Sequence, residues 1–132
     1  MDMKFTPSDP PRRFTVGVAE VLQISDTAHV QLDENEQITL VTNEGREFDI
    51  VRKSWGYYAT PSLNGRLKDF GLRALLVKSP SGFFFVLMIE QGKEKEAHRY
   101  LDIENQQIIC WLDTDEALAR IERALAGEAP DA

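Results

Sequence analysis

Seven consecutive apolar residues at positions 83–89, Phe-Phe-Phe-Val-Leu-Met-Ile, constrain the fold of this chain more than any other feature. Both alternating sets of side chains in the run are apolar. The run is far shorter than the ~20 residues that a helix needs to span a bilayer. A strand that is apolar on both sides requires cover on both faces. We therefore expect residues 83–89 to form a central strand of a sheet.

The rest of the chain carries several short strand signals. Alternating or β-branched patterns occur at residues 15–24, 29–33, 37–42, 48–53, 72–78, 96–103 and 107–112. Turn-forming residues separate these segments at intervals of ~8–12 residues, which is typical of a sandwich or a barrel. The pattern predicts a mainly β fold, a small antiparallel barrel or sandwich of about seven to nine strands.

The C-terminal region predicts a helix over residues 114–126, packed on one face of the sheet. Asp113 can cap its N-terminus, with Glu116 three residues later in a capping-box arrangement. Its apolar stripe consists of Leu118, Ile121 and Leu125. Such a short helix is not stable alone. We expect it to cover the apolar strands, which need a lid.

We expect one β-rich domain over residues 14–127, with a flexible arm at residues 1–13 and a tail at residues 128–132. The arm contains three prolines and no periodic apolar pattern. Length supports a single domain, because a chain of 132 residues is ordinary for one domain.

Residues 62–70 permit two interpretations. Asn64-Gly65 is a hairpin turn signal. Alternatively, Ser62 caps a short helix that places Leu63, Leu67 and Phe70 on one side, which would make the fold an α+β roll. The i, i+4, i+7 spacing favours the helix.

Charge and cysteine content limit the classes of partner. The net charge is −7, so the chain repels phosphate backbones, and we expect neither duplex nucleic acid nor a membrane as a partner. The single cysteine, Cys110, suits a reducing compartment, and the N-terminus lacks a signal-peptide core. We expect a soluble cytoplasmic protein.

Local catalytic motifs are missing from the sequence. It contains neither a glycine-rich phosphate loop nor HExxH, CxxC or GxSxG, and we expect no metal and no cofactor. If residues 96–103 form a strand, His98, Tyr100 and Asp102 share one face, where they could act as an acid–base row. A small enzyme with dispersed residues is therefore an alternative, although the sequence favours a non-catalytic protein.

The strongest local functional signal is a basic and aromatic segment at residues 52–73. It holds five basic side chains against a single acidic one, Asp69. Aromatic faces beside guanidinium groups can bind an anionic small molecule or an acidic protein segment. The predicted ligand-binding residues are Arg52, Lys53, Trp55, Tyr57, Tyr58, Arg66, Lys68 and Arg73. A non-catalytic binding or accessory protein is thus the leading hypothesis.

A third hypothesis is assembly. Exposed sheet edges favour homo-oligomers, and a dimer could bury the aromatic segment.

Residues 53–67, together with residues 109–113, resemble small bacterial proteins of unassigned function. The resemblance identifies no family and implies no activity.

Overall fold

The computed structural model describes residues 4–17, 19 and 21–128, which form three antiparallel sheets and three helices. The first sheet is a hairpin of β1 (Phe5–Val16) and β2 (Leu22–Val30). The second has the order β3 (Gln37–Val41), β4 (Glu47–Lys53) and β5 (Gly56–Ala59). The third has the order β7 (Phe84–Glu90), β6 (Leu72–Lys78) and β8 (Gln107–Trp111). The helices are α1 (Arg66–Asp69), α2 (Glu94–Ile103) and α3 (Asp115–Ala124).

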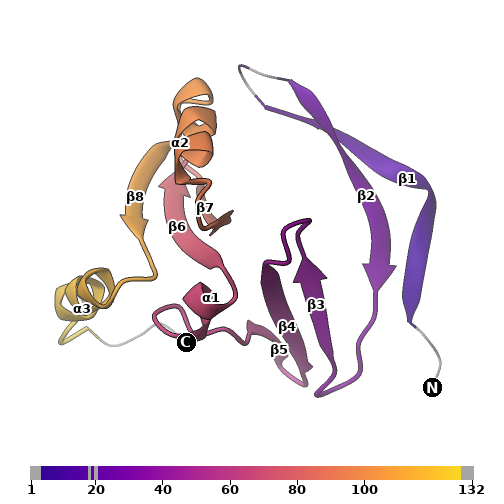
Figure 1. The fold of residues 1–132 in the computed structure, drawn as a ribbon, viewed down its shortest axis with the longest axis horizontal. Coiled ribbons are helices and arrows are strands. Elements are labelled where there is room, and N and C mark those ends of the chain that lie inside the picture. The colour runs from indigo at the N-terminus through magenta and orange to yellow at the C-terminus, as the bar shows by residue number, and fades with distance from the viewer. Residues whose placement is uncertain (1–3, 18, 20, 129–132) are drawn as a thin grey trace.

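The three sheets follow one another along the long axis of the molecule (Figure 1). The β1–β2 hairpin lies at one end and α3 at the other. The predicted mainly β class and the C-terminal helix are confirmed, but the sheets do not close into a barrel. The expectation that this helix covers residues 83–89 is wrong, because α3 has no buried residue and lies beside Cys110 of β8.

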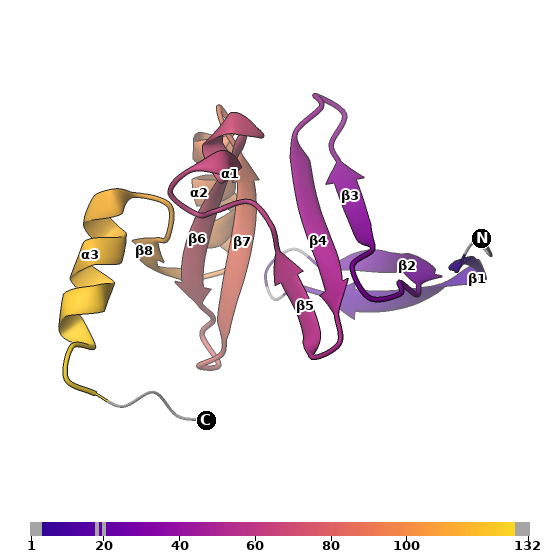
Figure 2. The ribbon, with the colours of Figure 1, turned by 90° about the horizontal axis from the view of Figure 1, so that it is seen from below.

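Strand β6 carries the hydrophobic core on both of its faces. On one face, Leu75 and Val77 pack with Leu101 of α2. On the other face, Leu72 and Ala74 pack with Leu67 of α1. Figure 2 shows the two helices on opposite sides of the sheet. Because successive side chains of a strand point to opposite faces, this single strand supports both clusters.

The prediction that residues 83–89 form a central strand is wrong for the single chain. Within the described residues, β7 pairs only with β6 and lies at an edge of its sheet. Phe84 and Val86 are exposed, and Ile89 is the buried residue of the strand. The central strand of this sheet is β6, which pairs with β7 on one side and β8 on the other. The apolar pattern of β7 therefore lacks the cover that it requires.

The expected flexible arm is also wrong from residue 5 onward, since residues 5–13 belong to β1. Proline removes a backbone donor, so it is tolerated in a strand that has a free edge. β1 pairs only with β2 among the described strands, and its register shifts between Pro7 and Arg12, across Pro10 and Pro11. Residues 1–3 and most of the expected tail lie outside the described residues.

Residues 96–103, predicted as a strand, belong to helix α2. Ala97 and Leu101 stand four residues apart and both pack against the cluster around Leu75. Glu94 and Glu96 lie in the first turn, where negative charge stabilises a helix. The helical spacing of Ala97 and Leu101 thus determines the structure of this segment, and the alternating pattern of residues 96–103 does not.

The other two helices begin differently from the expectation. Of residues 62–70, only residues 66–69 are helical, and the N-cap of α1 is Gly65 rather than Ser62, although the Ser62 hydroxyl accepts a hydrogen bond from the Arg66 amide at 2.9 Å. The alternative hairpin at Asn64-Gly65 is wrong. At α3 the cap is Thr114 rather than Asp113, because the Thr114 hydroxyl accepts the Ala117 amide at 3.1 Å.

An ion-pair bridge joins the second and third sheets. Nζ of Lys93, just before α2, lies 2.7 Å from Oε2 of Glu90 on β7 and 3.0 Å from Oε1 of Glu44 in the β3–β4 connection. The bond from Lys93 holds the pKa of the Glu90 carboxyl below its ordinary value of 4.5. The same carboxylates raise the pKa of Lys93, so this lysine stays charged at and below neutral pH.

We predict that Lys93→Met destabilises the protein more at pH 7 than at pH 3. A carboxyl whose pKa is depressed by folding stabilises the fold above its unfolded pKa, and the contribution is lost as pH falls through the folded pKa. Urea unfolding of the wild-type protein and the variant at several pH values measures the difference in their free energies of unfolding. Lys95→Met, which replaces an exposed lysine of α2, is the control. An equal loss at both pH values would contradict the bridge.

Candidate functional site

The predicted aromatic residues cluster at the tip of the β4–β5 hairpin. We call Arg52, Lys53, Trp55, Tyr57 and Tyr58 the aromatic tip. The tight turn after Lys53 carries Trp55, whose side chain is 70% exposed, and β5 carries Tyr57 and Tyr58, which are 60% and 46% exposed. Aromatic rings normally bury large areas in a core. The tip therefore exposes an unusually large aromatic surface.

The aromatic tip has two faces with different chemistry. The rings of Trp55 and Tyr58 stack with centroids 6.3 Å apart. Tyr57 lies opposite Arg52 in the strand register, and the guanidinium sits 5.6 Å from its ring centroid. Neighbouring residues of a strand point to opposite faces, so Tyr57 and Tyr58 lie on opposite faces of the hairpin. One side offers a stacked aromatic pair and the other a cation beside a ring.

The remaining predicted ligand-binding residues do not converge on the tip. Arg66 and Lys68 belong to α1, where the Arg66 guanidinium lies over the ring of Phe70 at 5.1 Å. Arg73 belongs to β6. None of the three lines the hollows described below. The basic and aromatic segment is continuous in sequence but divided in space.

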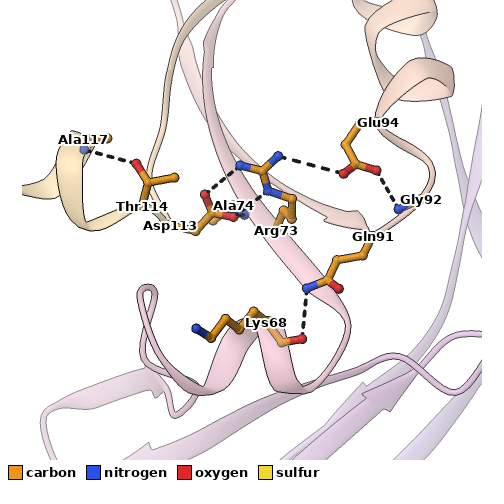
Figure 3. A network of polar contacts seen from close by, with 9 residues as sticks. All are labelled: Lys68, Arg73, Ala74, Gln91, Gly92, Glu94, Asp113, Thr114 and Ala117. Carbon is orange, nitrogen blue, oxygen red and sulfur yellow. Dashed lines mark hydrogen bonds and ion pairs between the residues drawn. The ribbon is translucent and has the colours of Figure 1, made fainter.

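The guanidinium of Arg73 is engaged inside the fold (Figure 3). Its Nε and Nη2 atoms donate to the two carboxylate oxygens of Asp113 at 3.0 and 3.2 Å. Its Nη1 atom lies 3.9 Å from Oε2 of Glu94, and its Cζ atom lies 3.8 Å from the ring centroid of Trp111. The side chain therefore fastens β6 to β8, α2 and the start of α3. A ligand could use this charge only by breaking those contacts.

The proposed acid–base row does not form. His98, Tyr100 and Asp102 lie on helix α2, where residues two positions apart point in nearly opposite directions. The His98 ring is tilted toward Trp111 with centroids 6.5 Å apart, whereas Tyr100 lines hollows beside β7. His29 lies on β2 beside Asp26 and Arg12. The expectation of a shared strand face is wrong, and no contact supports a catalytic role for the three residues.

A second surface, along β7, escaped the sequence analysis as a site. We call Phe84, Phe85, Val86 and Met88, with Tyr100 of α2, the β7 surface; all five are exposed. A hollow of about 550 Å³ runs between β7 and α2, and another of about 440 Å³ lies between β7 and the β1–β2 hairpin. The apolar run was visible in the sequence, but its exposure was not.

The second hollow also contains polar groups. Gln106 lines it, and the Oε1 atom of this side chain is buried without a hydrogen-bond partner. Oε2 of Glu104, which lines the same hollow, accepts the backbone amide of Ala19 at 3.2 Å and so ties the hairpin to the third sheet. The walls are mostly apolar, so the space suits apolar side chains better than an ion.

Two further searches concern metals and membranes. Among the described residues, no three His, Cys, Asp or Glu side chains gather closely enough to hold a metal ion. None of the helices formed by those residues is long and apolar enough to cross a bilayer.

Comparisons of the chain with protein-family models, with curated proteins and with solved structures gave no match.

We predict that Arg73→Ala lowers the free energy of unfolding by about 2–3 kcal/mol, because it leaves the largely buried Asp113 carboxylate without its charged partner. Arg66→Ala, which removes an exposed guanidinium from α1, should cost less than about 1 kcal/mol. Urea unfolding at one fixed protein concentration measures both. Similar losses for the two variants would contradict a structural role specific to Arg73.

Proposed function

We propose that this chain is a non-catalytic protein that works by self-association. The observation that carries the proposal is its exposed surface of 9835 Å². A compact monomer of 15.0 kDa exposes about 7,000 Å². The excess of about 2,800 Å² is more than three times the ~800 Å² that each partner buries in a standard interface. An excess of this size is typical of chains that fold with an obligate partner.

The residues that make up the exposed surface support the same conclusion. None of the seven phenylalanines is buried, and the fully or nearly buried hydrophobic residues of the described part number seven, from Leu67 to Leu101. Burial of apolar surface contributes about 25 cal/mol per Å² and is the main force for both folding and association. Because the single chain leaves much of its apolar surface exposed, association can gain further free energy by burying that surface.

The aromatic tip supports a second candidate function, the binding of an anionic ring compound or an acidic protein segment. The supporting observation is the stacked pair Trp55–Tyr58 on a hairpin that also carries Arg52 and Lys53. A ring can stack on the pair while Lys53, which shares the Tyr58 face of the hairpin, meets its negative groups. Arg66, Lys68 and Arg73 lie on other elements and take no part in this version of the site.

We predict that the purified protein is a dimer or a larger oligomer at micromolar concentration. Sedimentation velocity over a range of concentrations measures the mass of the species. Trp55→Ala serves as a comparison, because it tests whether the aromatic tip takes part in the contact. A strict monomer at every concentration would overturn the proposal of self-association.

We predict that UDP and a hexaglutamate peptide, used as probes, shift amide NMR signals of residues 52–58 at millimolar concentration. Trp55→Ala should weaken the binding about 2- to 10-fold, because a stacked aromatic pair contributes about 0.5–1.5 kcal/mol. Arg66→Ala, which lies on α1, should leave it unchanged. If neither probe shifts those signals, the second candidate function is wrong.

A further inference from the structure

The pattern of β7 and its position in the sheet are in conflict. Its side chains are apolar on both faces, as in a central strand, yet among the described strands it pairs on one side only. We propose that β7 pairs in antiparallel fashion with β7 of a second copy of this chain across a two-fold axis, which joins two three-stranded sheets into one of six strands. This inference rests on the proposed self-association and specifies where it occurs.

The backbone of β7 presents the groups that such pairing requires. Ser79 N donates to Phe83 O at one end of the β6–β7 pair, and Gln91 N donates to Gly71 O at the other. Hydrogen-bonded and non-hydrogen-bonded positions alternate in an antiparallel pair. The unbroken register of β6 and β7 therefore turns the amides and carbonyls of residues 84, 86 and 88 away from β6. These groups form the free edge.

The register follows from the ends of the strand. An axis at Val86 pairs Phe84 with Met88 of the second copy and uses the outward-facing residues 84, 86 and 88. It also leaves Glu90 outside the new pair, so that the bridge to Lys93 remains intact. The same register places Phe85 of the second copy opposite Leu87, which lines the hollow of about 550 Å³ beside α2. An aromatic ring can then fill that hollow.

The uncharged stretch of β7 allows a second copy to pair there despite the net charge of each copy. Each copy carries a net charge of −7, so two copies repel each other at most contacts. Residues 83–89 contain no charge, and an antiparallel two-fold pair brings no acid opposite an acid there. The excess of about 2,800 Å² exposed per chain is ample for a dimer of this kind. The surface is therefore suited to its own copy.

The first test compares Val86→Lys with Val41→Lys. Both valines are exposed, at 53% and 61%, and both lie on edge strands, β7 and β3. The Val86 side chain is exposed in the single chain, so we expect the variant to keep the fold, which circular dichroism checks. We expect Val86→Lys to weaken association at least about tenfold, because it puts two like charges on the axis. Val41→Lys should leave the association unchanged.

The second test is disulfide cross-linking in a Cys110→Ser background. The Cα atoms of a hydrogen-bonded antiparallel pair lie ~5.5 Å apart, within the range for a disulfide. Mild oxidation should therefore link Val86→Cys chains into covalent dimers in high yield, and Val41→Cys chains in low yield. An oligomer that survives Val86→Lys, or equal cross-linking at both positions, would overturn the β7 pairing alone. A monomeric wild-type protein would instead overturn self-association itself.

Discussion

Burial of β6 on both faces is the constraint on which the rest of this structure depends. α2 covers Leu75 and Val77, and α1 with Phe48 covers Leu72 and Ala74. The Arg73 guanidinium holds the neighbouring strand and helices against the same strand. Everything beyond these two clusters is attached at few points, so the outer sheets contribute little buried surface to the single chain.

The sequence predicted the kinds of element better than their places. The mainly β class, the short helix near Ser62 and the C-terminal helix were all readable from local patterns. The identity of the central strand was not readable from these patterns. Residues 74–77 of β6 are also apolar on both sides, but they form a shorter run than residues 83–89. The local pattern of a strand indicates whether one or both of its faces must be packed against other residues. It does not say which strand receives that cover within one chain.

Tertiary contacts explain the other differences. Ala97 and Leu101 showed helical spacing, but His98, Tyr100 and Asp102 alternated around them and suggested a strand. Asp113 was the expected cap of α3, but its carboxylate accepts hydrogen bonds from Arg73, and the Thr114 hydroxyl caps the helix instead. The basic and aromatic segment predicted the aromatic tip, but no local signal could show that Arg66 and Lys68 would lie on a different element.

The described strand edges differ in how they are protected against association, and the difference singles out β7. Natural sheets protect their edges with prolines, charges or short strands. β1 carries three prolines, β2 contains Asp26, β5 and β8 have four and five residues, and β3 runs between the acids Glu36 and Glu44. β7 has seven residues, of which only the last, Glu90, is charged, and Lys93 neutralises that charge. An acidic chain that leaves one long edge unprotected has a surface on which its own copy meets little repulsion.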